Sequence, residues 1–120
     1  MSPKIDHAAL DKQLNDQILT GDVLNAFETY YADDVVMQEN LDEPRAGKET
    51  NRKYEQQFVE SVAEWNHAEL LGSAVNGDQS YSEWAYEFTF KNGQRMKIAQ
   101  VAARRWRDGK VVQERFYHKG

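Results

Sequence analysis

The stretch of sequence that decides the fold is residues 81–118, YSEWAYEFTFKNGQRMKIAQVAARRWRDGKVVQERFYH. Two dipeptides, Asn92-Gly93 and Asp108-Gly109, divide it into three segments rich in aromatic and aliphatic residues. Asn-Gly and Asp-Gly are strong signals for tight β-hairpin turns, because these residues tolerate positive φ angles. The stretch therefore predicts three consecutive antiparallel strands.

The length of each hairpin loop decides which side chains face one another across the strands. With a three-residue loop at residues 91–93, Phe88 faces Met96, whereas a two-residue loop sets Phe88 beside Lys97, a poorer match of apolar bulk. A shift of one residue would move every side chain to the other face of the sheet. We therefore predict three-residue loops, with the same register continued through a second loop at residues 107–109.

That register gives the predicted sheet two different faces. One face is bulky and aromatic, yet it carries polar residues, which need a partner or a cavity where they are buried. We expect the functional site on this face. The aromatic face consists of Trp84, Tyr86, Phe88, Phe90, Met96, Ile98, Gln100, Ala102, Arg104, Trp106, Val112, Glu114, Phe116 and His118, and the opposite face of Glu83, Ala85, Glu87, Lys97, Ala99, Val101, Ala103 and Arg105.

Composition and charge exclude several classes of protein. The 120 residues are enough for one domain with a real core, and 40% hydrophobic with 29% charged residues is typical of soluble globular proteins. A net charge of −5 argues against a nucleic-acid partner, which would require a basic surface. Since the chain has no cysteine and no apolar N-terminal run or membrane-spanning segment, we expect a soluble, cytoplasmic protein without a membrane partner.

The rest of the chain predicts helices followed by strands. Apolar residues recur at four-residue spacing over residues 6–20, and similar apolar patterns predict helices over residues 23–31 and 48–63. Asp6 is the expected N-cap of the first helix, and Gly21 its end.

Two further strands complete the predicted sheet. They cover residues 35–39 and 65–75, with a turn at residues 32–34 before the first strand and a loop at residues 40–47 after it. Helices first and an antiparallel sheet afterwards indicate a single α+β domain with its helices on one face of the sheet.

Four short motifs in this order are familiar. They are Gly21-Asp22, residues 31–36 (YADDVV), residues 43–47 (EPRAG) and residues 107–112 (RDGKVV). Together they resemble the SnoaL-like group of the nuclear-transport-factor-two-like superfamily, relatives of ketosteroid isomerase, over nearly the whole chain. The resemblance implies a cystatin-like cone, in which a strongly curved mixed or antiparallel sheet wraps around three helices and an apolar pocket. It does not fix the function, because this fold hosts isomerases, cyclases, dehydratases, epoxide hydrolases and plain binding modules.

The resemblance also points to one acidic residue. The isomerase branch carries its base a few residues after the Ala-Asp-Asp turn, a position that Glu39 holds in this sequence. A carboxylate at the mouth of an apolar pocket can take and return protons near neutral pH, because burial penalises its charge. The alternative interpretation is an exposed glutamate at the end of a strand. The branch's oxyanion donors correspond here to Leu14 and Ala102, which cannot donate, so steroid isomerase activity is not expected.

Arg104 and Glu114 are candidates to replace these donors. In the predicted register Glu114 faces Ala102 and lies diagonal to Arg104, within reach of a salt bridge. The two residues could equally form a structural ion pair near the end of the sheet. We predict catalytic roles for Glu39, Arg104 and Glu114, and a ligand-binding wall formed by Tyr30, Met37, Tyr54, Phe58, Trp84, Tyr86, Phe88, Ile98, Gln100, Ala102, Phe116 and His118.

Two functions remain open. The first is cofactor-independent acid–base chemistry, of the isomerase, cyclase or dehydratase type, on a small hydrophobic or polycyclic molecule. The second is a dimeric module that holds a ligand or a protein partner and catalyses nothing. No histidines and acids have metal-ligand spacing, so neither function includes a metal. A pocket filled by its own aromatic side chains would favour the second function.

The small-residue face of the sheet predicts a homodimer. Ala85, Ala99, Val101 and Ala103 form a flat surface that is too apolar to be left in water, and relatives of this fold commonly dimerise through it. Because a symmetric contact repeats every change on both subunits, replacing Val101 or Ala99 by arginine should yield monomers in light scattering. An unchanged mass for wild type and Val101→Arg would contradict the prediction.

Overall fold

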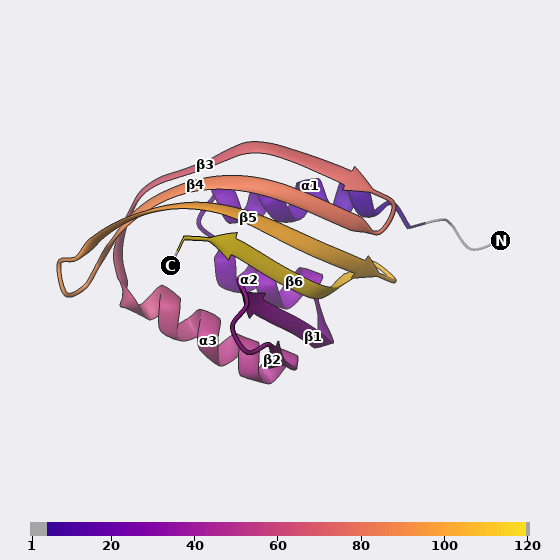
Figure 1. Ribbon diagram of the computed structural model, residues 1–120, viewed down its shortest axis with the longest axis horizontal. Coiled ribbons are helices and arrows are strands. Elements are labelled where there is room, and N and C mark those ends of the chain that lie inside the picture. Colours follow the sequence, from indigo (N-terminus) through magenta and orange to yellow (C-terminus); the bar gives the residue numbers. More distant parts are fainter. Residues whose placement is uncertain (1–4, 120) are drawn as a thin grey trace.

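The computed structural model describes residues 5–119, which form three helices and six strands (Figure 1). The helices come early in the chain, and the last four elements are long consecutive strands. The elements are α1 (His7–Leu19), α2 (Val23–Tyr30), β1 (Tyr31–Glu39), β2 (Arg45–Ala46), α3 (Lys48–Ser61), β3 (Val62–Asn76), β4 (Gln79–Phe90), β5 (Arg95–Arg107) and β6 (Lys110–His118).

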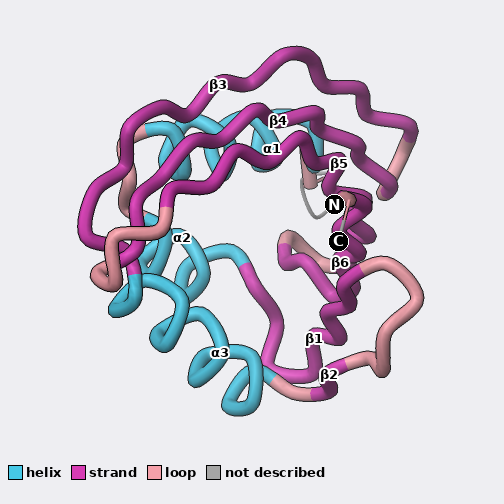
Figure 2. The backbone as a smooth tube through the Cα atoms, turned by 60° about the vertical axis from the view of Figure 1, so that its left-hand side comes forward, coloured by secondary structure: helices cyan, strands magenta, loops and turns pink. Residues whose placement is uncertain are grey.

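The six strands form one mixed sheet in the order β2-β1-β6-β5-β4-β3. All neighbouring strands are antiparallel except β1 and β6, which are parallel. The sheet curls without closing, and the three helices lie on the side toward which it curls (Figure 2). This arrangement confirms the predicted α+β cone. The predicted loop at residues 40–47 contains the short edge strand β2.

The first hairpin has the predicted register. Phe88 faces Met96 and Tyr86 faces Ile98, and the backbone N–H of Phe90 donates to the carbonyl oxygen of Gln94 across a three-residue loop. Matching apolar bulk across the strands was therefore a valid criterion for this turn.

The second hairpin has a different turn from the one predicted. Asp108 and Gly109 both have positive φ, 52° and 81°, and they form a two-residue loop between Arg107 and Lys110. Two residues with positive φ make the type I′ turn, whose twist suits a β-hairpin. The prediction of a three-residue loop was wrong here because Asp-Gly satisfies this tighter turn without an additional residue.

A β-bulge between Arg105 and Trp106 compensates for the shorter turn. As a result Arg104 faces Glu114 directly, two residues away from the predicted pairing of Glu114 with Ala102. Val111 is fully buried in place of the predicted Val112. Glu114, Phe116 and His118 keep their predicted inner face, because the bulge restores the alternation of side chains.

The first half of the chain differs from the prediction mainly at element ends. Asp6 caps α1 as predicted, since its side chain accepts a hydrogen bond from the backbone N–H of Ala9. The predicted turn at residues 32–34 belongs to β1, whose pairing with β6 is irregular between Tyr31 and Val36. Helix α3 ends at Ser61, and β3 begins at the next residue. In residues 5–119 no helix is long and apolar enough to cross a membrane.

The hydrophobic core lies at one end of the cone. It joins α1, α2, β1 and the second hairpin, and it leaves most aromatic residues of β4 outside this cluster. Its buried members are Leu14, Ala26, Phe27, Tyr31, Val35, Met37, Trp106 and Val111.

The outer face of the sheet carries the residues predicted for it. Glu87 faces Lys97, as the register predicted. An ion pair between these two opposite charges would be expected, but the carboxylate of Glu87 pairs with the guanidinium of Arg95 instead, at 2.6 Å. Val101 and Ala103 are partly buried within the single chain, and Ala99 is exposed. Dimerisation through this face stays a prediction.

The type I′ turn generates a test of stability. Gly109→Ala should lower the free energy of unfolding by about 1 kcal/mol, because a residue with a Cβ is strained at positive φ. A Cβ at Gly109 would meet only ordinary contacts, the nearest at 3.7 Å from Leu10, so crowding adds little. The matched control is Gly72→Ala in β3, where φ is ordinary and no atom lies within 4 Å. Equal thermal denaturation midpoints for the two variants would contradict the proposed strain.

Candidate functional site

A cavity of about 730 Å³ lies between the inner face of the sheet and the helices. Its size is within the usual range for pockets that hold small organic molecules. All predicted site residues except Tyr30 line it, including Glu39, Arg104 and Glu114. The cavity is therefore not filled by the aromatic residues of its own walls.

Tyr30 is the exception because helix α2 ends at this residue. Its hydroxyl donates a hydrogen bond to Gln13 on α1, 3.4 Å away. The next residue, Tyr31, begins β1 and lines the cavity instead. The helix ends one residue earlier than the predicted range of residues 23–31, and the strand begins directly after it rather than at Val35. This difference brings Tyr31 rather than Tyr30 to the cavity.

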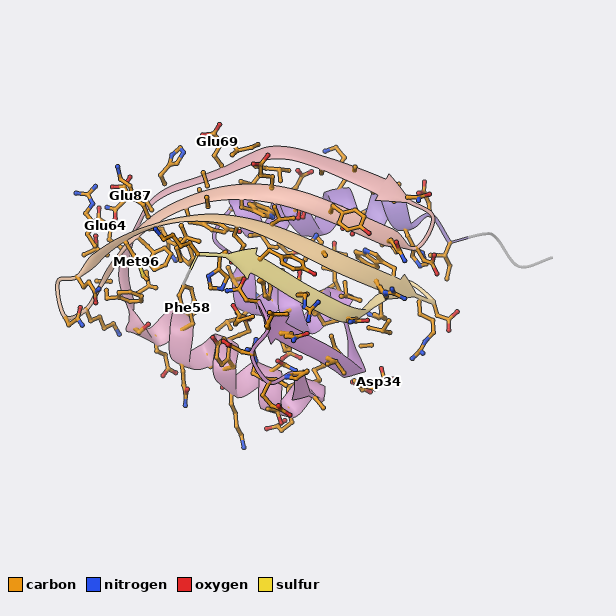
Figure 3. The ribbon with its side chains drawn as sticks, in the orientation of Figure 1. Asp34, Phe58, Glu64, Glu69, Glu87 and Met96 are labelled. Atoms are coloured by element: carbon orange, nitrogen blue, oxygen red, sulfur yellow. The ribbon has the colours of Figure 1, made fainter. Side chains whose placement is uncertain are left out.

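Phe58 and Met96 mark one end of the cavity. Phe58 points from α3 toward the sheet, and Met96 lies near the beginning of β5 (Figure 3). Glu64, Glu69 and Glu87 lie on the outer side of the same end of the sheet (Figure 3). Met96 is 38% exposed, so this end of the wall is open to solvent.

A buried ion pair forms the opposite wall. The Arg104 guanidinium donates to Glu114 at 2.7 Å and to Asp11 of α1 at 3.0 Å. Arg104 is 3% exposed and Glu114 is 1% exposed. Burial alone would lower the pKa of Arg104, but the carboxylates of Glu114 and Asp11 raise it, so the guanidinium stays charged.

Neutral side chains complete this network. Asn15 accepts from Arg104 at 2.6 Å, Ser80 donates to Asp11 at 2.7 Å, and Tyr31 donates to Glu114 at 2.5 Å. Burial raises the pKa of Tyr31 well above its usual value, and the Glu114 charge raises it further. The tyrosine is thus held as a hydrogen-bond donor.

Sequence reasoning missed the partners of Arg104 on α1. Asp11 and Asn15 are both 2% exposed and lie four residues apart, around the buried Leu14. Two polar residues at helical spacing on the apolar side of a helix were the signal that could have revealed them, because a buried carboxylate requires a cationic partner.

Glu39 lies in a second polar cluster at the cavity wall. Its carboxylate accepts from Arg45 at 3.0 Å and lies 3.3 Å from Nε2 of His118. The Arg45 guanidinium stacks on the ring of Tyr54, 3.7 Å from the centroid, and donates to the buried Asn51. Both carboxylate oxygens of Glu39 are therefore oriented by neighbours. His118 is the last residue of β6, and its backbone N–H donates to the side chain of Asn40 at 2.9 Å.

Glu55 is the cavity residue that the sequence analysis missed. It lines the cavity from α3, and no described residue donates a hydrogen bond to it or pairs with it. Burial raises the pKa of Glu55 to about 7, and the negative charge of Glu114 adds to the effect. The positive charge of Arg45 opposes this rise, and the charge of Glu39 adds a smaller increase. The place of Glu55 four residues after the buried Asn51 and three before Phe58 puts it on the inner side of the helix, which was the available signal.

Hydrogen-bond donors for a bound ligand are few. Leu14 and Ala102 line the cavity and cannot donate, as expected. Nε1 of Trp84 already donates to Ser82, at 2.8 Å. Tyr86 lines the cavity, and its hydroxyl has no hydrogen-bond partner among residues 5–119. Burial raises the pKa of Tyr86 above the usual value, so the hydroxyl remains protonated and able to donate. No group of histidine and acidic side chains in the described residues could hold a metal ion.

Comparisons with known proteins agree on one family. The family model of the SnoaL-like domain matches residues 12–114. A protein from Mesorhizobium loti assigned as a SnoaL-like polyketide cyclase has a similar structure, with a TM-score of 0.84 and 30% sequence identity over 94% of this chain and 99% of that one. No curated protein matches the chain in sequence.

More distant structures share the fold alone. A Catenulispora acidiphila protein with a ketosteroid isomerase-like fold, solved in complex with trimethylamine, has a TM-score of 0.69 and 17% identity over 84% of this chain and 78% of that one. An epoxide hydrolase of M. tuberculosis has a TM-score of 0.74 and 12% identity over 92% and 80% of the two chains. Proteins of this fold are thus named for different activities, among them a polyketide cyclase and an epoxide hydrolase.

The buried network predicts a large effect of removing its cation. Arg104→Met should lower the free energy of unfolding by about 3–5 kcal/mol, because two buried carboxylates lose their partner. The matched control is Arg105→Met, on the exposed outer face of the same strand, where a change within about 0.5 kcal/mol is expected. Denaturant unfolding at neutral pH measures both variants, and similar stabilities would contradict the role of the network.

Proposed function

The chain belongs to the SnoaL-like domain family, and from this premise we propose that it binds a small, largely apolar organic molecule in the cavity and performs acid–base chemistry on it without a cofactor. The observation that carries the proposal is the open cavity of about 730 Å³, whose walls bear carboxyl groups amid aromatic side chains. Relatives in this family and fold are named as polyketide cyclases and an epoxide hydrolase.

The apolar walls supply the binding energy of the proposed complex. Four aromatic side chains pack edge-on or tilted around the open end: Phe58, Phe88, Trp65 and Tyr86. The ring centroids are 5.3 Å apart in the Phe58–Phe88 pair and 6.2 Å apart in the Trp65–Tyr86 pair. Such rings bury a large apolar area against a flat or polycyclic ligand without requiring hydrogen bonds.

Glu39 is the proposed base. Arg45 and His118 fix the orientation of its carboxylate, and a fixed carboxylate beside an apolar ligand can remove a proton from a carbon next to a carbonyl group. In that step the C–H bond breaks, the proton passes to a Glu39 oxygen, and the electron pair moves to the carbonyl oxygen. Return of the proton to another carbon or to oxygen completes an isomerisation or assists a cyclisation.

Tyr86 is the proposed donor for the negative charge that develops on the ligand oxygen. Tyr86 lines the cavity and its hydroxyl is protonated, so it can donate the hydrogen bond that Leu14 and Ala102 cannot donate. One neutral donor stabilises such a charge less than a pair of donors does, which limits the proposed chemistry to carbon acids that are activated by conjugation.

A non-catalytic binding module is the second candidate. The observation that favours it is the absence of donors at Leu14 and Ala102, together with the full engagement of both Glu39 oxygens by Arg45 and His118. In this case the same cavity would hold its ligand unchanged.

Replacing Glu39 separates the two candidates. Glu39→Gln should remain folded and bind the same ligands as wild type in a screen of aromatic ketones and enols, because the amide keeps the size of the side chain. It should lose at least about 100-fold of any turnover that wild type shows, since the amide cannot accept the proton. The matched control is Glu43→Gln, on the exposed loop before β2. Binding without turnover in wild type would support the binding module, and equal turnover in both variants would exclude Glu39 as the base.

A further inference from the structure

The carboxyl groups around the cavity differ in whether they have a cationic partner. Glu114 has Arg104 at 2.7 Å, and Glu39 has Arg45 at 3.0 Å. Glu55 lines the same cavity and has neither a hydrogen bond nor an ion pair within residues 5–119. Its carboxyl group is therefore free to meet a ligand.

The two guanidinium groups near the cavity are fully engaged. Arg104 is shared between Glu114 and Asp11, and its Nη1 also donates to Asn15. Arg45 is held between Glu39, Asn51 and the ring of Tyr54. Neither can turn toward Glu55 without leaving another carboxylate unpaired, so the protein itself offers no spare cation there.

The walls of the cavity are suited to an organic cation rather than to a hydrated metal ion. Tyr86 stacks on Trp84 with centroids 5.5 Å apart, and the Trp65 ring meets Tyr86 edge-on at 6.2 Å. Aromatic faces attract ammonium groups and tolerate their apolar substituents, whereas a metal ion needs several oxygen ligands in a compact shell. Apolar rings with one unpaired carboxyl group are the features of an amine site.

We propose that the ligand of the cavity carries a cationic ammonium centre on an apolar body, and that Glu55 pairs with that centre. The proposal rests on the binding function proposed above and specifies the chemical class of the ligand. The apolar body lies among the rings of the open end, and the ammonium group faces α3. A permanently charged quaternary ammonium satisfies the site as well as a protonated amine does.

The protonation of Glu55 makes the affinity depend on pH. Several charged or titratable groups are close enough to act on its charge: Glu39 and Tyr31 from β1, Arg45 from β2, Tyr54 from α3, Tyr86 from β4 and Glu114 from β6. Because burial and the neighbouring carboxylates raise the pKa of Glu55 to about 7, the group is largely protonated in mildly acidic solution. A cation binds the ionised form, so its affinity rises as pH rises through this pKa.

The test compares two probes of the same shape and different charge. Phenyltrimethylammonium carries a permanent positive charge, and tert-butylbenzene replaces its nitrogen by carbon. NMR titration of the ring signals of Trp65 and Tyr86 reports binding inside the cavity. The cation should bind more tightly than the neutral probe at about pH 8, and its affinity should increase about tenfold between about pH 6 and about pH 8, because the ionised fraction of a group with a pKa near 7 changes by that factor.

The variant that decides the proposal is Glu55→Gln. It should bind the cation about tenfold more weakly at about pH 8, without dependence on pH, and bind tert-butylbenzene as wild type does. It is expected to fold, since it removes a carboxylate that burial disfavours. The matched control is Glu60→Gln, on the exposed side of the same helix, which should resemble wild type with both probes.

The outcomes distinguish this proposal from the binding function on which it rests. Binding of tert-butylbenzene alone, or equal binding of both probes at every pH, would overturn the cationic ligand and leave an apolar binding site. A cation affinity that Glu55→Gln does not change would overturn the role of Glu55. Failure of both probes to shift any cavity signal would overturn the cationic ligand and the binding function together.

Discussion

The buried guanidinium of Arg104 is the interaction on which the rest of the structure depends. It lies on β5, yet its partners come from β6 and from α1, so one cation joins the sheet to the first helix. Hydrogen bonds from Ser80 and Tyr31 to the same carboxylates extend the network to β4 and β1. Displacing any of these partners would leave a buried charge unpaired, and the network therefore fixes the position of α1 against the sheet.

That network also explains why the two sides of the cavity differ in how their charged groups are paired. On the sheet side Arg104, Glu114 and Glu39 all have ion-pair partners. The hydrophobic core, which includes Leu14, Phe27 and Trp106, lies at this end of the cone. On the α3 side Glu55 has no partner within residues 5–119, and it lines the cavity together with the aromatic rings of the open end. Groups that the fold leaves unsatisfied are the ones available to a ligand, since satisfying them costs the protein no existing contact.

The sequence predicted the parts of the structure that local patterns determine. The pairing of Phe88 with Met96 followed from apolar bulk and an Asn-Gly turn, and the Asp6 cap from its place before a helical pattern. The bulge after Arg105 was not predictable from pattern, because the two-residue turn and the bulge together preserve the same alternation of faces. Glu55 was overlooked since a glutamate in a charged helix reads as a solvent-facing residue until the cavity is known.

The position of Glu55 suggests how one fold serves different chemistry. Curvature of the sheet, the Arg104 network and the apolar core create a hollow whatever its lining residues are. In this chain Leu14 and Ala102 line the cavity without hydrogen-bonding groups, and the side chains proposed to react or to bind lie at the end of β1, on β4 and on α3. A side chain on the inner face of α3 can change without touching the ion network or the strand register. The activity of such a domain is therefore decided by a few lining residues that contribute little to its stability.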